Sequence, residues 1–310
     1  MDVVTHALAG GLVAAAVLRR PSWPAIAAAA GGALAPDLDA VARLWDPIAS
    51  ITVHRTATHS LIGGVPLAAA SGAAVKLAWP RARLAGLASF AYLGVLSHIG
   101  LDLFNAFGTA VLWPFDSRRF GLGWLYVIDP IAIALVLAGL LLTFRFGRFQ
   151  RGWARGALVA LGVYAAVAGA TRSRAEAQFT RGLEARGVAL ARPVVVPVFP
   201  GPLRWMAVAD AGDAVYGARF WVGALAPDSL TVVTRPASAP PPGVESLPEV
   251  RAFRAFARLP WRTEIVDGDG RIVEYRDLAF EDHPWGGPMA LRLRLDASGA
   301  VTGIHLGHRF

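Results

Sequence analysis

The sequence predicts an α-helical integral membrane bundle of about six spans, followed by a small β-rich (α+β) domain outside the membrane. Apolar residues make up 55% of the 310 residues and charged residues only 17%, a balance that is unusual in water-soluble globular proteins. The first half consists of apolar runs joined by short loops that contain arginine. Up to residue 175 every acidic side chain is Asp, whereas all seven Glu residues come later. The two halves therefore differ in composition, as a membrane part and an extramembrane part would.

Six apolar runs account for the predicted spans. They cover roughly residues 4–18, 21–36, 60–79, 84–104, 127–144 and 156–171. Several have only about sixteen uncharged residues, against about 20 in a helix that crosses a bilayer. Arg side chains that reach the headgroups and Trp residues at the interface can extend such helices. The alternative, a buried bundle in a soluble protein, is disfavoured by six such runs with arginine between them.

The loop charges predict the orientation of the bundle. The loops after the first, third and fifth runs carry nine basic residues and no acidic ones, which places these loops in the cytoplasm by the positive-inside rule. With six alternating spans, the His and Asp residues near the ends of the runs then lie together on the outer side.

We predict three segments: a membrane domain at 1–171, an exposed connecting helix at 172–190 and an extracytoplasmic β-rich domain at 191–310. The sequences at 267–270 and 296–299 contain Asp and Gly between strand-like runs, the signal of a hairpin turn. A helix is expected around 246–258.

Composition excludes several classes of function. The chain has no cysteine, so disulfides and Cys-type zinc sites are excluded. The net charge of +8 comes almost wholly from Arg scattered between apolar runs, which argues against a nucleic-acid partner. The chain contains no Gly-x-Ser-x-Gly elbow and no phosphate-binding glycine loop. Serine nucleophiles and P-loop chemistry therefore have little support.

Metal-ligand residue types gather at the ends of the apolar runs. His98 and Asp102 are four apart in a helical run, so they project from one face. A buried carboxylate needs compensation, which a metal ion would provide; a His–Asp hydrogen-bonded pair that stabilises the bundle is the alternative. His54 and His59 are five apart, so at least one lies outside a regular helix. The set includes four of the seven histidines and three Asp residues: His6, His54, His59, His98, Asp37, Asp39 and Asp102.

Convergence of these residues favours a metal centre over their separate structural roles. Taken alone, Asp37 and Asp39 after Pro36 are typical of a turn or a helix cap. A lone His6 is typical of a residue at the membrane interface. Together they exceed one tetrahedral zinc shell. We expect one or two divalent ions, Zn first, with Mn or Fe also suited to mixed nitrogen and oxygen ligands. Such a site acidifies bound water, and Arg55 would stabilise an anion, which points to hydrolysis.

The chain contains five ordered motifs. They are Met1-Asp2-x-x-Thr5-His6, Pro36-Asp37-x-Asp39, His54-Arg55-x-x-Thr58-His59-Ser60, Ser97-His98-x-x-x-Asp102-x-x-Asn105 and the segment from Trp113-Pro114-Phe115 to Asp129-Pro130. Over roughly residues 1–170 they resemble the YdjM-like inner-membrane proteins, whose domain is labelled as a membrane-bound, metal-dependent hydrolase. The resemblance implies a multi-pass protein of a bacterial-type inner membrane, but no substrate.

Specific roles follow for the predicted site. The expected metal ligands are His6, Asp37, Asp39, His59, His98 and Asp102. The expected catalytic groups are His54 (a ligand or an acid–base group), Arg55 (an anion contact) and Asp129 (an orienting group). Thr58 and Asn105 are expected to orient the ligands. A site at the outer headgroup level favours a lipid or a lipid-linked ester or phosphoester as substrate.

Three rival hypotheses remain open. The metal could have a purely structural role and join the helices, which a closed ligand shell would favour. The protein could be a transporter, which would require polar residues at mid-membrane depth and paired broken helices. The C-terminal domain could carry the activity through His283, His305 and His308, although they lack a convincing carboxylate set.

Overall fold

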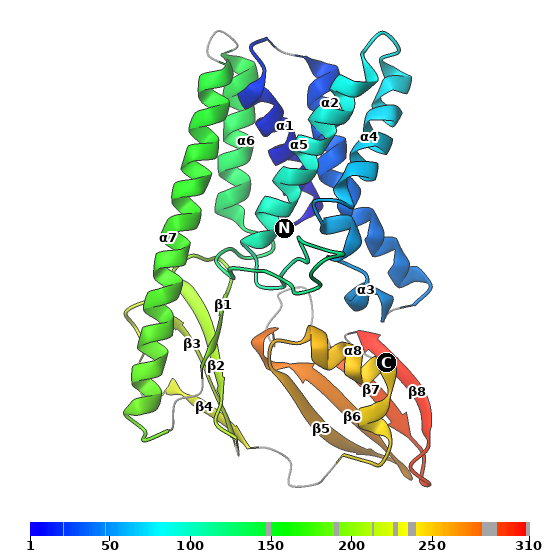
Figure 1. Cartoon of the computed structure of the whole chain (residues 1–310). Helices are drawn as coiled ribbons and strands as arrows, with labels where there is room; N and C mark the ends of the chain where they lie inside the picture. The colour runs from blue at the N-terminus through cyan, green and yellow to red at the C-terminus, as the bar shows by residue number, and fades with distance from the viewer. Residues whose placement is uncertain are drawn as a thin grey trace. The chain divides into compact units, whose positions relative to one another are not determined.

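The computed structural model describes residues 1–20, 22–46, 48–146, 150–188, 192–212, 214–225, 229–234, 240–280 and 290–307. The chain divides into two compact units. The helical unit contains Met1–Val41, Val53–Ala170 and Phe199–Pro202. The sheet unit contains Ala42–Thr52, Thr171–Val198 and Leu203–Phe310. Figure 1 shows the elements of both units along the chain.

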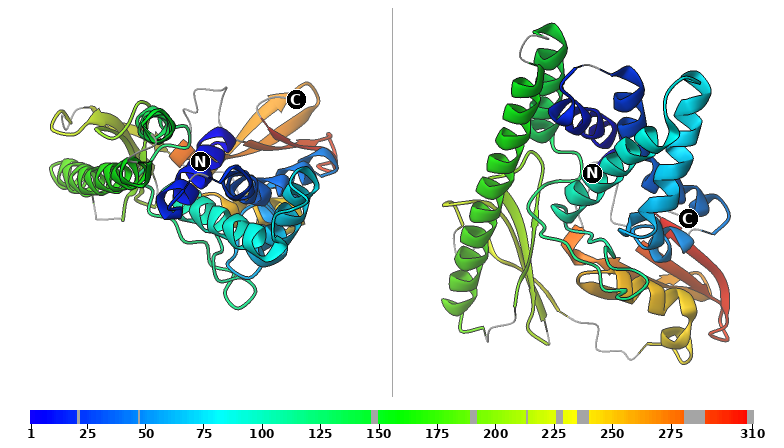
Figure 2. Two further views of the ribbon diagram at one scale, coloured as in Figure 1. Left: turned by 90° about the horizontal axis from the view of Figure 1, so that it is seen from above. Right: turned by 45° about the horizontal axis from the view of Figure 1, so that its top comes forward.

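The helical unit is built from the apolar runs of the sequence. Its elements are α1 (Val3–Val17), α2 (Trp23–Leu34), most of η1 (Ala35–Leu44), η2 (Ala57–His59), α4 (Gly64–Ala78), α5 (Leu84–Leu103), α6 (Pro130–Arg145) and the first part of α7 (Gln150–Glu184). Helix α5 packs against α1, α2 and α4, and α1 also packs against α2 and α6. The two views in Figure 2 show α1, α2, α4 and α5 side by side.

Local sequence signals explain where two of these helices begin. The carboxylate of Asp2 accepts hydrogen bonds from the backbone N–H groups of Val4 and Thr5 at the start of α1. Asp129 does the same for Ile131 and Ala132 at the start of α6. These carboxylates satisfy N–H groups that have no partner within the helix.

Two glycines allow α2 and α5 to pack at backbone contact. A Cβ atom at Gly94 of α5 would lie 1.9 Å from the carbonyl oxygen of Ala29, and one at Gly32 of α2 would lie 2.0 Å from that of Ala91. Only glycine fits at these positions, because such distances are far below van der Waals contact. The close approach brings the end of α2 next to the last two turns of α5.

The prediction of about six spans is not supported. Among the residues that the structure describes, three helices are long and apolar enough to cross a membrane, at Trp23–Ala42, Leu84–Leu103 and Arg151–Glu184. The apolar helices α1, α4 and α6 have only 15, 15 and 16 residues. A helix of 15 residues is about 22 Å long, which is shorter than the hydrocarbon core of about 30 Å. The apolar runs predicted the helices correctly. The residues that flank them do not extend α1, α4 and α6 to the length of a bilayer-spanning helix.

The sheet unit contains two four-stranded antiparallel sheets, in which each strand pairs with the next along the chain. The strands are β1 (Val194–Pro197), β2 (Arg204–Asp210), β3 (Ala214–Trp221), β4 (Thr231–Thr234), β5 (Pro260–Asp267), β6 (Gly270–Asp277), β7 (Ala290–Leu295) and β8 (Val301–Gly307). The short elements are α3 (Ala49–Thr52), η5 (Val244–Ser246), α8 (Pro248–Phe256) and η6 (Leu278–Phe280). The predicted hairpins join β5 to β6 and β7 to β8, and both are confirmed.

Each sheet is covered on one face by a helix. Ala175, Phe179 and Leu183 of α7 are fully buried against the first sheet, where they contact Trp205 and Phe220. Val250 and Phe253 of α8 pack in the same way against Val273 and Leu293 of the second sheet, among other residues. In both helices the apolar residues recur at a spacing of three or four, which places them on one face.

Helix α7 differs from the predicted boundary between a sixth span and a connecting helix. The run at 156–171 and the segment from 172 form one uninterrupted helix, Gln150–Glu184. The segment that we expected to be exposed is buried along the stripe Ala175–Phe179–Leu183, because that stripe covers the first sheet. Residues 189 and 190 of the predicted connecting helix lie outside the described residues, as do His283 and His308.

Candidate metal centre

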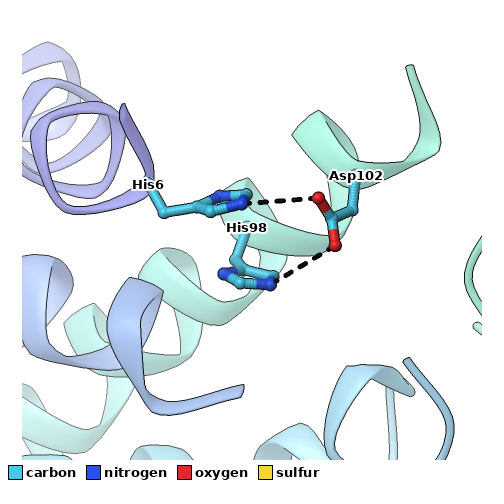
Figure 3. A group of neighbouring side chains, drawn as sticks. All are labelled: His6, His98 and Asp102. Carbon is cyan, nitrogen blue, oxygen red and sulfur yellow. Dashed lines mark ion pairs between the residues drawn. The ribbon is translucent and has the colours of Figure 1, made fainter. Parts of the chain in front are cut away.

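His98 and Asp102 lie one turn apart near the end of α5 and point to the same side, as their spacing predicts (Figure 3). The His98 Nε2 atom is 3.6 Å from Asp102 Oδ2. Both side chains are fully buried. Bulk water therefore solvates neither the Asp102 carboxylate nor the His98 imidazole. A buried carboxylate with this environment requires compensating partners.

Helix α1 brings His6 to the same place. The His6 Nε2 atom lies 3.4 Å from Asp102 Oδ1, and the His6 ring stacks on that of His98 with 3.7 Å between centroids. The amino group of Met1 also contacts Asp102 Oδ1 and lies 2.8 Å from His6 Nε2. His6 is fully buried, so α1 contributes an imidazole to the interior of the cluster.

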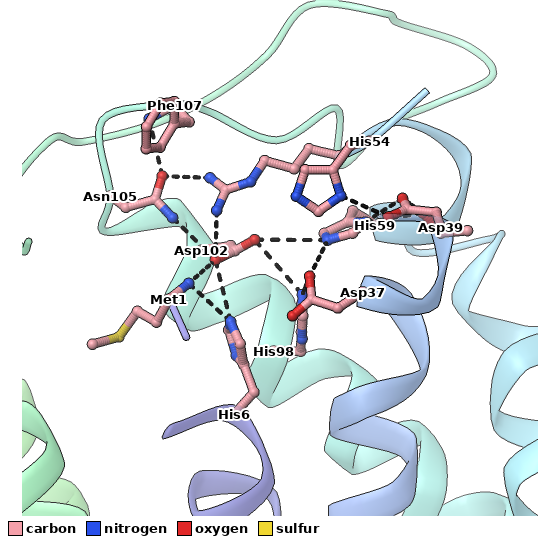
Figure 4. A network of polar contacts seen from close by, with 12 residues as sticks. Met1, His6, Asp37, Asp39, His54, His59, His98, Asp102, Asn105 and Phe107 are labelled. Carbon is pink, nitrogen blue, oxygen red and sulfur yellow. Dashed lines mark hydrogen bonds and ion pairs between the residues drawn. The ribbon is translucent and has the colours of Figure 1, made fainter. Parts of the chain in front are cut away.

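The other ligand candidates come from η1 and η2, which are far from α5 in sequence (Figure 4). Asp37 Oδ1 is 3.4 Å from His59 Nε2 and 3.7 Å from His98 Nε2. His59 Nε2 is 3.8 Å from Asp102 Oδ2. We call Asp37, His59, His98 and Asp102 the central four, because their atoms Oδ1, Nε2, Nε2 and Oδ2 face one another.

Three of the central four, Asp37, His59 and His98, form a set that could hold a divalent cation. Four distances among the atoms of the central four are 3.4 to 3.8 Å, and donors of a tetrahedral ion with bonds of about 2.1 Å are about 3.4 Å apart. His59 Nε2, His98 Nε2 and Asp102 Oδ2 are buried and have no hydrogen-bond partner among the described residues. Buried polar atoms normally have hydrogen bonds, so three such atoms that have only ion-pair contacts with one another and with Asp37 suit a shared cation.

The tautomers of both central histidines suit metal binding. The Nδ1 atom of His98 is 2.7 Å from the carbonyl oxygen of Ala33, which can only accept, so Nδ1 carries the proton and Nε2 a lone pair. Thr58 Oγ1 donates to Asp39 and lies 2.9 Å from His59 Nδ1. Nδ1 of His59 is therefore the donor to Thr58. Metal-binding histidines are commonly oriented by such hydrogen bonds from the other ring nitrogen.

Arg55 and Asn105 hold the opposite side of Asp102. Asn105 Nδ2 donates to Asp102 Oδ1 over 3.0 Å, and Arg55 Nη2 lies 3.4 Å from the same oxygen. Arg55 Nη1 donates to Asn105 Oδ1 over 2.6 Å, and the guanidinium stacks over Phe107. Arg55 is buried and has a φ of 64°, a conformation that non-glycine residues adopt rarely and at a cost. The strained backbone directs this cation inward.

His54 lies at the edge of the cluster and pairs with Asp39. Its Nδ1 atom is 2.6 Å from Asp39 Oδ1, and its side chain is 28% exposed. The rings of His54 and His59 are in edge contact at 5.0 Å. Asp39 Oδ2 is 3.4 Å from His59 Nδ1, so this carboxylate connects the two imidazoles. The ligand atoms lie within 4.8 Å of one another in each of three sets that could hold a metal ion: His6–His98–Asp102, Asp37–His59–His98 and Asp39–His54–His59.

The negative charge of the cluster is strong enough to reverse the effect of burial on His59. Burial lowers the pKa of the His59 imidazole, but hydrogen bonds with Asp37 and Asp39 and the charge of Asp102 raise it. The pKa therefore lies above its ordinary value of 6.5. A protonated His59 partly replaces the positive charge that a metal ion would bring.

Asp129 has contacts of a different kind from those of the cluster. Besides capping α6, it accepts hydrogen bonds of 2.9 and 2.8 Å from the Tyr164 hydroxyl. Burial raises its pKa, although its hydrogen bonds act in the opposite direction. The interactions described for Asp129 are those of a helix cap, so its expected role as a catalytic orienting group gains no support.

Sequence reasoning missed two contributors. The carbonyl of Ala33 sets the His98 tautomer, but a backbone group leaves no residue-type signal. Arg119 Nη2 donates to the carbonyl of His54 over 3.0 Å, which ties the loop after α5 to the His54 segment. Arg119 belongs to the fifth motif, so its position in that motif was the available signal.

The comparisons with known proteins concern the helical half of the chain. A family model described as "YdjM inner membrane protein" matches residues 1–175, more than half of the chain. The curated "Uncharacterized protein YfhP" of Bacillus subtilis (strain 168) is 30% identical over 155 residues, which cover 47% of this chain and 47% of that protein. The chain thus matches about half the length of this relative. No solved structure matches the chain.

Proposed function

Because the chain belongs to the YdjM family of inner membrane proteins, we propose that it is a membrane-bound, metal-dependent hydrolase whose centre is the His/Asp cluster. The single observation that carries the proposal is the set of three buried, unpaired donor atoms on His59, His98 and Asp102. Together with Asp37 Oδ1 they form ion pairs of 3.4 to 3.8 Å, and Asp37, His59 and His98 are one of the sets that could hold an ion.

The central four would hold the first ion, and zinc suits their mixed nitrogen and oxygen donors; manganese and iron are the alternatives. A second ion would draw on His6, or on His54 and Asp39, which belong to the overlapping sets. The chemistry that a bound divalent ion supplies is Lewis acidity, which polarises an ester or phosphoester and acidifies water near neutral pH.

The remaining residues of the cluster have distinct tasks in this proposal. Asp39 holds the His54 ring through Nδ1, so that the exposed side of His54 accepts or donates a proton at the reacting bond. Arg55 and Asn105 fix Asp102 through Oδ1 and leave Oδ2 for the ion. Arg55 also supplies positive charge that stabilises an anionic group of the substrate.

The proposed location of the site follows from the helix ends. His98 and Asp102 lie in the last turns of α5, and Asp37 and Asp39 follow the end of α2. These positions favour the headgroup level of a bilayer and a lipid or lipid-linked ester or phosphoester as substrate. The loops that follow α1, α4 and α6 carry the basic residues, which favours the cytoplasm for these loops and the outer side of the membrane for the cluster.

The test measures metal content and hydrolysis of the purified full-length protein together. The wild type should contain at least one equivalent of a divalent metal and hydrolyse a member of a panel of ester and phosphoester lipids. His98→Ala should lose both, whereas His305→Ala, a histidine of strand β8 outside the cluster, should lose neither. Hydrolysis that persists in chelated, metal-free wild type would contradict the proposal.

A structural metal site is the second candidate, and one observation favours it. The cluster contains four imidazoles and three carboxylates in overlapping sets, and a closed four-ligand shell is typical of structural zinc. In that case the ion only joins η1, η2 and α5. Stoichiometric metal, a large loss of thermal stability on chelation and no hydrolysis of any substrate in the panel would support this alternative.

A further inference from the structure

An apolar cavity of about 380 Å³, widely open to the surface, lies in the helical unit between segments that adjoin the cluster in sequence. It is lined by Leu103, Val111, Leu112, Phe120, Gly121 and Leu122. Its volume falls within the range of small-molecule sites. The lining side chains are all apolar, so the cavity suits a hydrocarbon ligand and offers no side chain that would orient a polar one.

Backbone hydrogen bonds attach the walls of the cavity to the residues of the cluster. Leu103 follows Asp102 in α5, and its carbonyl accepts a hydrogen bond of 2.7 Å from the N–H of Leu122. On the other wall, the carbonyl of Val111 accepts one of 3.0 Å from Leu61, two residues after His59. The cavity is therefore held at a fixed position relative to two of the central four.

The loop that forms the cavity has the composition of a membrane interface. Leu112, Phe115 and Phe120 are 46%, 84% and 39% exposed, and Arg118 lies over the ring of Phe120. Exposed aromatic and aliphatic side chains beside arginine are typical of the headgroup region. In an inner membrane protein, the bilayer is the source of the hydrocarbon that contacts such a loop.

We propose that this cavity binds one acyl chain of a membrane phospholipid and so presents the polar part of that lipid to the His/Asp cluster. The inference rests on the proposed function only where it names the substrate class, an acyl lipid. Binding of the chain itself follows from the apolar walls, their attachment to the cluster and the interfacial loop, and it requires no bound metal.

The experiment uses the full-length protein in vesicles of phosphatidylethanolamine and phosphatidylglycerol that contain a phospholipid with a diazirine in one acyl chain. After illumination, labelled peptides are located by mass spectrometry. Label should concentrate in residues 103–122 and fall when unlabelled phospholipid is added. Leu112→Trp, which fills the cavity, should reduce label in that segment about tenfold, the scale on which apolar pockets discriminate by fit. Val111→Phe is a second filling variant.

Leu77→Trp is the matched control, because Leu77 is 84% exposed on α4 and does not line the cavity. It should leave the labelling of residues 103–122 unchanged. Label spread evenly over the exposed helices of the wild type, or label that both filling variants leave intact, would overturn the inference. Stronger labelling by a diazirine-bearing polyprenyl lipid would overturn the acyl assignment. Labelling is measured on chelated protein as well, so failure of the hydrolase proposal would not remove it.

Discussion

His98 of α5 donates its Nδ1–H to the backbone carbonyl of Ala33 in α2, over 2.7 Å. This bond joins two helices that are 65 residues apart in sequence and determines which nitrogen of His98 faces the cluster. The close packing at Gly94, one turn before His98, makes the bond possible. The chemistry of the cluster therefore depends on the helix packing beneath it, and four predictions follow from that dependence and from the contacts of the cluster.

Replacement of Asn105 should weaken metal binding without abolishing it. Asn105 orients Asp102 through a hydrogen bond of 3.0 Å and does not belong to the metal-binding sets. Asn105→Ala should lower the metal affinity about 10- to 100-fold, as is usual for residues that orient a ligand. Competition with a chelator of known affinity measures the change. Ser89→Ala, an exposed position on α5, is the control, and equal affinities for the two variants would contradict the assignment.

Gly94→Ala should destabilise the helical unit, whereas Gly100→Ala should not. A methyl group at Gly94 would overlap the carbonyl of Ala29, while one at Gly100 meets no described atom within 4 Å. The cost of overpacking at Gly94 is about 1–3 kcal/mol or more; at Gly100, alanine favours the helix by about 1 kcal/mol. Thermal unfolding in detergent and metal content measure the two variants. Metal content that is intact in Gly94→Ala would show that the helix contact does not position His98.

Metal affinity should decrease as the pH falls. The pKa of His59 is raised above 6.5 in the metal-free protein, so this imidazole is protonated at and below that pH and must release its proton to bind an ion. For each proton displaced, the apparent affinity should fall about tenfold per pH unit below the pKa. Zinc titrations between pH 6 and pH 8 measure the slope. An affinity that is constant over this range would exclude His59 as a ligand.

His54→Gln distinguishes an acid–base group from a ligand. Because His54 is paired with Asp39 at the edge of the cluster and is partly exposed, we expect the variant to retain its metal. The turnover number should fall about 100-fold or more, the usual contribution of a general acid–base group, and one limb of the pH–rate profile should disappear. Loss of metal together with activity would instead make His54 a ligand. His59→Gln, which should lose metal, is the comparison.

Local sequence patterns were sufficient for the apolar helices and for two hairpins. The apolar runs correspond to helices, and the Asp–Gly turns correspond to the two hairpins. These elements depend on residues that are close in the chain, so apolar periodicity and turn composition are enough to predict them. The number of spans was not accessible in the same way. Whether a short helix is lengthened by its flanking residues depends on how those residues fold, and α1, α4 and α6 end within 15 or 16 residues.

The candidate site was partly accessible to the same reasoning. Spacing placed His98 and Asp102 on one face of a helix, and the residue types indicated a cation. Asp129 had the same residue type and a similar place beside a helix, yet it caps α6 and binds Tyr164. A carboxylate at a helix end has the same sequence signal in both roles, so only its partners in space distinguish them.

The sequence by itself determined which chemical groups this protein has and which local elements carry them: imidazoles and carboxylates beside apolar helices, and strands joined by Asp–Gly turns. The tertiary structure alone decided that Asp37, His59, His98 and Asp102 face one another and that Ala33 sets the tautomer of His98. The physical reason is the separation along the chain over which each interaction acts. Dihedral preferences and periodicity act over a few residues. Ligand atoms within 4.8 Å of one another require η1, η2 and α5 to come together, which the close contact of α2 and α5 at Gly32 and Gly94 allows.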